Sequence, residues 1–158
     1  MIGIFEIAKA TCKTLNDNFP DIRIYAREVK EGMKTPSFFV NTKALVRNHN
    51  SKINKDIKAL VNITYFSGNI PNAMENCKMQ DRLLEAFGML LETEDDKGDI
   101  KYLELKDISS GDTVNGDAYF NFRIDRIDYV NKEEEIKDKM ADLFIEYDMD
   151  KGEIKWQK

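Results

Sequence analysis

The chain has 158 residues, a length that fits a single domain. Hydrophobic residues make up 42% and charged residues 34%, a balance typical of globular rather than disordered proteins. The formal net charge is −5, and the longest apolar runs are far shorter than the roughly 20 residues that cross a bilayer. We therefore expect a soluble protein without a membrane partner and without a sequence-specific nucleic-acid partner.

The N-terminal region predicts a helix followed by a strand. Apolar side chains recur at intervals of three and four between Ile2 and Leu15, which is the pattern of an amphipathic helix. Pro20 ends this helix, because proline lacks the N–H that the helical hydrogen-bond ladder needs. Apolar and polar residues then alternate from Ile22 to Arg27, as in a strand with one buried face, and a connection containing Gly32 follows.

Two long strands are expected next. The first begins at Pro36 and runs to about Arg47, and its partner runs from about Ile53 to Phe66. The polar segment 48–54 between them predicts a solvent-exposed hairpin tip. Strands of this length are longer than most, so we expect the hairpin to project beyond the body of the domain.

One basic cluster lies on and beside this hairpin. It comprises Arg47, Lys52, Lys55 and Lys58, and the chain's single histidine, His49, falls within the predicted tip. His49 has no neighbour in the sequence that would make it a catalytic base or a metal ligand. A solvated flank is the default interpretation of the cluster, although its charges suit contact with an acidic protein or a nucleic-acid backbone. We take Arg47, His49, Lys52, Lys55 and Lys58 as the candidate subunit or partner interface.

The second half of the chain predicts one more helix and further strands. Asn72 suits the N-cap of a helix from Ala73 to about Glu92, after which an acidic turn over 93–99 and a short strand over 100–105 follow. The Asn115-Gly116 pair predicts a tight hairpin turn. The next strand, over 118–127, alternates strongly, and we expect it to lie inside the sheet.

The pattern weakens beyond Val130. We interpret this region as a short helix or an extended arm, followed by a hairpin around Asp150-Lys151-Gly152. The whole pattern predicts an α+β fold, with a mostly antiparallel sheet and a long projecting hairpin packed against two amphipathic helices. We place most of the phenylalanines in the core between the sheet and the helices: Phe5, Phe38, Phe39, Phe87, Phe120 and Phe122.

Few residues offer material for chemistry. Cys12 and Cys77 sit in helical patterns and are expected to be buried free thiols. No phosphate-binding glycine loop is present, and a single histidine nearly excludes nucleophilic triads and multi-histidine metal sites. An acidic cluster could bind a divalent cation, but a solvated turn is the default: Glu92, Glu94, Asp95, Asp96 and Asp99. We therefore assign no catalytic residue, no cofactor and no metal.

The order of elements and several short segments resemble one protein family. The segments are Phe19-Pro20 after the first helix, Ile24-Tyr25 in the first strand, Pro36 before Phe38-Phe39-Val40, and Tyr65-Phe66. A helix over 74–91 and an aromatic strand over 119–126 keep the same succession. The chain is similar here to the tail terminator (tail completion) proteins of long-tailed phages and of contractile R-type bacteriocin particles, which include collar proteins.

The resemblance covers about residues 1–130 and implies a structural role without enzyme activity. Its members form a hexameric ring at the head-proximal end of the tail tube, stop tube polymerisation and offer a docking surface for the head or collar. The implied partners are other copies of the chain and the tail tube protein, with sheath and head-connector or collar proteins as further candidates. The implied location is the bacterial host cytoplasm during assembly and afterwards the virion or phage-like particle.

Residues 1–130 are expected to form the terminator-like α+β domain, and 131–158 to be a C-terminal extension or arm of it. Aromatics on both faces of a strand, as at Phe38-Phe39 and Tyr119-Phe120, indicate that one sheet face is covered by another subunit. The alternative functions are a monomeric protein-binding adaptor and a carboxylate- or metal-dependent enzyme.

Overall fold

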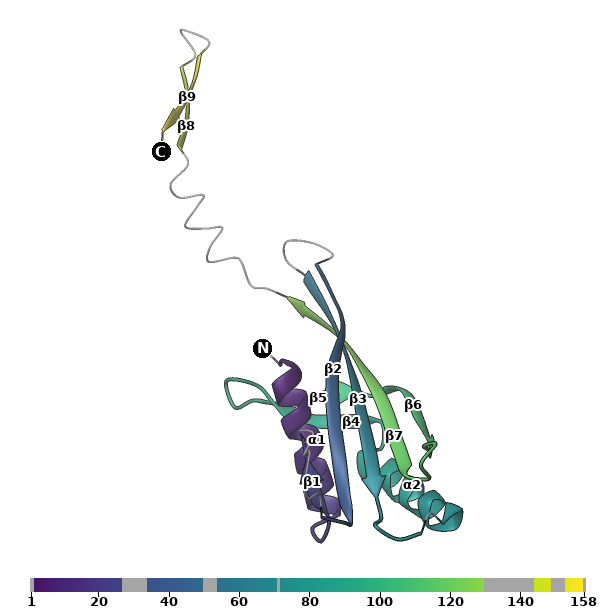
Figure 1. Ribbon diagram of the computed structural model, residues 1–158. Coiled ribbons are helices and arrows are strands. Elements are labelled where there is room, and N and C mark those ends of the chain that lie inside the picture. The colour runs from purple at the N-terminus through teal and green to yellow at the C-terminus, as the bar shows by residue number, and fades with distance from the viewer. Residues whose placement is uncertain are drawn as a thin grey trace.

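A five-stranded sheet forms the centre of the structure, which is a computed structural model that describes residues 2–26, 34–49, 54–70, 72–129, 144–148 and 153–157 (Figure 1). β1 pairs in parallel with β2, whereas the other neighbouring strands of this sheet are antiparallel. In spatial order the strands are β1 (Arg23–Tyr25), β2 (Ser37–His49), β3 (Asn54–Phe66), β7 (Ala118–Tyr129) and β6 (Lys106–Asp112). The mostly antiparallel α+β fold that the sequence predicts is therefore confirmed.

Two helices contribute to the core on one face of this sheet. α1 (Ile4–Asn18) lies against β2, and α2 (Ala73–Phe87) lies against β7 and β6. Figure 1 draws β3 and β7 in front of α2. The sheet and both helices supply one continuous core, because residues at every second strand position join the buried helix residues: Ile7, Leu15, Phe38, Val40, Ala59, Val61, Ile63, Leu83, Phe87, Phe120, Phe122 and Ile124.

Aromatic rings occupy much of this core. Phe87, the last residue of α2, packs against Phe120 and Phe122 of β7 at centroid distances of 5.6 and 5.4 Å. Phe38 of β2 packs edge-on against Phe19, which follows α1, at 5.2 Å. Phe38, Phe87, Phe120 and Phe122 lie in the core as predicted. Two phenylalanines that were also expected there do not: Phe39 is half-buried on the opposite face of the sheet, and Phe5 is 75% exposed on α1. Its position falls outside the buried stripe of the helix.

The second helix is shorter than predicted. α2 ends at Phe87, because Gly88 adopts a positive φ of 55° and its N–H bonds to the Leu84 carbonyl, instead of continuing to Glu92. The chain then forms β4 (Leu90–Glu94) and β5 (Ile100–Glu104), an antiparallel pair that we call the ribbon. The predicted helix ran too far because Leu90 and Leu91 were assigned to its apolar stripe. In the structure every second residue of β4 is buried, which is the pattern of a strand and not of a helix.

The ribbon covers the helix side of the core. Its inner residues Leu91 and Leu103 belong to the same buried cluster as the helices, and β4 lies against α1. β6, which the sequence analysis missed, follows directly and pairs with β7 through a turn at Asn115-Gly116. That turn was predicted, and Gly116 supplies its positive φ of 85°. The strong alternation of β7 is confirmed as well, with strands on both sides of it.

The β2–β3 hairpin extends beyond the helices as predicted (Figure 1). β7 accompanies β3 along this extension, with the register running from Tyr65↔Ala118 to Asn54↔Tyr129. The projecting part is therefore three strands wide. β2 carries a bulge between Ala44 and Val46, where an extra residue sharpens the local twist.

A separate two-stranded sheet lies near the C-terminus of the chain. β8 (Phe144–Asp148) pairs in antiparallel fashion with β9 (Glu153–Gln157), which confirms the hairpin predicted around Asp150-Lys151-Gly152. The helix or arm predicted before it falls in 130–143, outside the described residues.

Both cysteines are free thiols, as predicted, but only one is sheltered. Cys12 is partly buried, and burial raises the pKa of its thiol. Cys77 is exposed, so its predicted burial is wrong. The buried residues of α2 lie on a different side of the helix: Asn76, Met79, Leu83 and Phe87. None of the helices in the described residues is long and apolar enough to span a membrane.

Candidate docking surfaces

The interface predicted from the sequence is spread over two strands. Arg47 and His49 belong to β2, whereas Lys55 and Lys58 belong to β3. The register pairs His49 with Lys55, so His49 ends a strand instead of lying in the hairpin tip. The side chain of Lys58 is exposed, and Lys52 lies outside the described residues. Strand pairing thus brings the backbones of His49 and Lys55 together, which the sequence spacing alone did not indicate.

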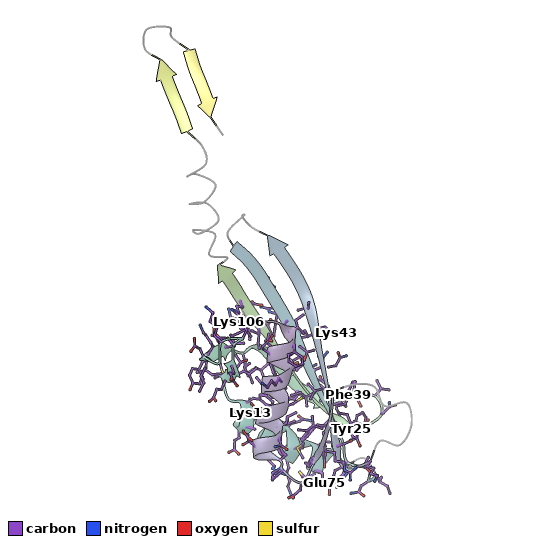
Figure 2. The ribbon with its side chains drawn as sticks, turned by 90° about the vertical axis from the view of Figure 1, so that its left-hand side faces the viewer. Lys13, Tyr25, Phe39, Lys43, Glu75 and Lys106 are labelled. Carbon is purple, nitrogen blue, oxygen red and sulfur yellow. The ribbon has the colours of Figure 1, made fainter. Side chains whose placement is uncertain are left out.

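The face of the sheet opposite the helices carries side chains in ordered rows. The first row is aromatic and crosses the strands at Tyr25, Phe39, Thr64 and Tyr119, ending at Gly111. These side chains are half-buried, and Figure 2 shows Tyr25 and Phe39 close together at one end of the sheet. A Cβ atom at Gly111 would lie 2.8 Å from the hydroxyl oxygen of Tyr119, so the absence of a side chain there accommodates the tyrosine ring.

The second row consists of amides. Asn41, Asn62 and Asn121 are register partners on β2, β3 and β7, and Ser109 continues the row on β6. All three asparagine side chains are half-buried. Amide groups in such a row offer both donors and acceptors to a facing protein. No sequence pattern links the three positions, because only the strand register aligns them.

The third row is cationic. Lys43, Leu60, Arg123 and Lys106 are register partners on β2, β3, β7 and β6, and we call them the cationic row. Figure 2 shows Lys43 and Lys106 at a similar height, farther along the sheet than Phe39. Both lysines are exposed, and neither forms an ion pair within the described part of the chain.

Arg123 is the one member of the cationic row that is neutralised locally. Its Nε and Nη2 donate to the two carboxylate oxygens of Asp125 at 2.8 and 3.0 Å, and Asp107 forms a second ion pair with it. The hydrogen bonds to Asp125, together with the attraction of both carboxylates, raise the pKa of the guanidinium. Arg123 is therefore held in place, whereas Lys43 and Lys106 keep their charge available for a partner.

The outward face of the ribbon is apolar and acidic, in contrast to the cationic row. Three large apolar side chains are more than half exposed there, namely Leu90 at 55%, Ile100 at 61% and Tyr102 at 64%. Glutamates alternate with them in the register: Leu90↔Glu104, Glu92↔Tyr102 and Glu94↔Ile100. This surface was not predicted from the sequence, because the predicted second helix ran on through β4. The alternation of Leu90 to Glu94 after Gly88 was the signal that could have revealed it.

The acidic turn of the ribbon is organised by its own backbone. Asp95 accepts hydrogen bonds from the N–H groups of Asp99 and Lys97, each at 2.9 Å, and pairs with Lys101 at 3.7 Å. These bonds, with the one from Asp99 first, lower the pKa of the Asp95 carboxyl. Such bonding is typical of a structural turn. Among the described residues, no three His, Cys, Asp or Glu side chains group as metal ligands would.

A cavity of about 270 Å³ lies beside the contact between the ribbon and α1, and residues of both line it. Charged side chains of both signs line it, and Lys13 forms an ion pair with Glu92 across it at 3.8 Å. Mixed charges that already face one another leave little net field for a charged ligand. The distinctive surfaces of the described structure are therefore the uncovered sheet face and the outward face of the ribbon.

This fold and these surfaces define a small α+β protein with two broad faces of different chemistry. The chain matches the family model described as phage tail terminator protein over residues 6–136, and it belongs to that family. None of the curated proteins matches it. Membership implies a structural, non-enzymatic role in capping the tail tube, contact with that tube, and a place in the virion.

Proposed function

We propose that copies of this chain form a hexameric ring on the head-proximal end of the tail tube. The ring halts tube polymerisation and presents its other side to the head or collar. The family match over residues 6–136 carries the proposal, since that family caps tail tubes. Sheath, head-connector and collar proteins are its further partners, and a phage or a headless bacteriocin particle with a contractile tail provides the setting.

The architecture supports a capping role on physical grounds. A closed ring needs a head-to-tail contact between two different patches of the same chain. The uncovered sheet face and the ribbon are two such patches, and they differ in charge and in exposed apolar side chains. A ring whose two sides differ adds to the tube on one side and offers no matching surface on the other, which ends growth.

We also propose how the chain divides its tasks. Residues 1–130 form the terminator domain, and 131–158 form an extension or arm of that domain. The basic hairpin residues are proposed as a subunit or partner contact at the edge of the ring: Arg47, His49, Lys52, Lys55 and Lys58. The projection of this hairpin beyond the helices supports that assignment, because it carries the paired strand ends at His49 and Lys55 beyond the body of the subunit.

Deleting the gene tests the capping role. We expect tails of abnormal length, or tails without caps, in electron micrographs of the mutant lysate. The wild-type gene supplied in trans should restore uniform tails, and antibody-labelled protein should mark one terminus of each tail. Tails of normal length in the deletion strain would contradict the proposal.

Charge reversal tests the hairpin contact separately. The variant Lys55→Glu with Lys58→Glu should fold normally yet restore uniform tail length less well than wild type. Lys34→Glu with Lys78→Glu, a matched double change at exposed positions outside the hairpin and the ribbon, should restore it fully. Equal rescue by both variants would remove the hairpin from the proposal and leave the capping role in place.

A further inference from the structure

Two exposed surfaces of this chain match each other in charge, apolar content and spacing. The cationic row has exposed lysines at its ends and Leu60 between them. The outward face of the ribbon has Glu94 and Glu104 at opposite corners, with exposed Tyr102 between them. We infer that the ribbon of one copy docks on the cationic row of a second copy.

The spacing of the charges supports this pairing. Lys43 and Lys106 are separated by three inter-strand intervals, so their Cα atoms lie about 14 Å apart. Glu94 and Glu104 are separated by four residues along the ribbon and one interval across it, which also gives about 14 Å. Two carboxylates can therefore face two ammonium groups at the same time.

All four charged side chains are exposed. Neither lysine and neither glutamate forms an ion pair in the described residues. Glu94 lines the cavity beside α1 with Lys9 and Lys13, but it is Glu92 that pairs with Lys13 there. Charges at the rim of a contact steer the partners and fix their register, while the apolar centre supplies most of the affinity. Tyr102 is the largest exposed side chain at that centre.

The contact links two different patches, so it is heterologous. The ribbon packs on the helix side of the sheet, whereas the cationic row lies on the opposite face, and one copy cannot satisfy both within itself. Repetition of a heterologous contact gives a closed ring or an open filament. In a ring each copy makes the contact twice, so a modest pairwise affinity suffices. This inference rests on the proposed ring, because it names the surfaces that close it.

Charge exchange in solution tests the contact. Lys43→Glu with Lys106→Glu should weaken self-association about tenfold or more in sedimentation velocity, and Glu94→Lys with Glu104→Lys should do the same. All four changes in one chain should recover most of the lost association. Normal association of either double variant, or no recovery in the quadruple variant despite a wild-type unfolding curve, would overturn the inference.

A matched control keeps net charge from explaining the result. Lys34→Glu with Lys78→Glu changes net charge as much as the lysine pair above, at two exposed positions outside the cationic row. Self-association of this variant should stay within about twofold of wild type. An equal loss of association in the control would assign the effect to net charge and overturn the inference.

Crosslinking in assembled tails tests the same contact where the ring functions. A chain with Cys12→Ala and Cys77→Ala, carrying Leu60→Cys and Tyr102→Cys, should give a ladder of linked chains on oxidation. Leu60→Cys with Val114→Cys, whose second site is fully exposed in the β6–β7 turn, should give no ladder. Capped tails without the Leu60–Tyr102 link would overturn the inference and leave the proposed function intact. A ladder of linked chains in particles with unregulated tail length would support the contact between copies and contradict the proposed capping function.

Discussion

Replacing Phe87 with alanine should remove much of the stability of this protein. Phe87 is 3% exposed and joins the end of α2 to β7 through its contacts with Phe120 and Phe122. Truncation of a buried phenylalanine costs about 3–5 kcal/mol, because the lost apolar contact adds to the cavity that remains. A domain of this size is stable by only about 5–15 kcal/mol in total. Phe87→Ala should therefore remain folded at low temperature but unfold in mild denaturant.

Urea unfolding followed by circular dichroism measures this loss directly. With a denaturant slope of about 2 kcal/mol per molar, the midpoint should fall by about 2 M. Phe87→Leu keeps most of the volume and should cost less than about 1.5 kcal/mol. Phe5→Ala removes a ring that is 75% exposed, so its midpoint should stay within the error of wild type.

A double-mutant cycle separates ring contacts from simple burial. Phe87→Leu combined with Phe122→Leu should be destabilised by about 0.5–1.5 kcal/mol less than the sum of the two single changes, because the two rings contact each other. A similar midpoint for Phe87→Ala and Phe5→Ala would refute the reasoning. It would mean that α2 is not held against β7 by this aromatic cluster.

Three smaller perturbations test other parts of the fold. Asn76→Ala removes the Nδ2–H that bonds at 2.8 Å to a carbonyl of the β6–β7 turn, and should cost about 1–3 kcal/mol in urea unfolding. Asp95→Asn should be less stable than wild type at neutral pH, because the pKa of the Asp95 carboxyl is lowered in the folded protein and the ionised carboxylate therefore stabilises it. The difference in stability should shrink as the pH falls below about 4, where the carboxylate becomes protonated. A difference that does not change with pH would exclude the charge as the cause. Gly68→Ala should cost about 1–3 kcal/mol, because Gly68 has φ +76° and its new Cβ would contact Thr35; wild-type stability would show that this loop relaxes freely.

Helices and strands with a strong apolar periodicity could be predicted from the sequence. Ends of helices that depend on the conformation of a single residue could not. The alternation in β7 and the Asn115-Gly116 turn follow from local preferences, and the structure confirms both. The end of α2 was missed because Leu90 and Leu91 fit the helical stripe as well as a strand. The conformation of Gly88 decides between the two, and glycine at that position is only a weak signal in a sequence.

The docking surfaces were less predictable for a different reason. The basic hairpin was found because its charges are close in sequence. The cationic row joins Lys43 to Lys106 across strands that are distant in sequence, so it exists only once the register is known. β6 itself was missed, because Lys106 to Asp112 contains a single large apolar residue and an interrupted register with β7.

The third strand beside the projecting hairpin has a mechanical consequence. A hairpin of only two strands bends and twists easily. Here β7 pairs with β3 over the range Asn54–Tyr65, and its hydrogen bonds stiffen the β2–β3 hairpin along its length. The extension then acts as a stiff spacer. A spacer of fixed length transmits force without folding back, and it holds whatever it contacts at a constant distance from the body of the subunit.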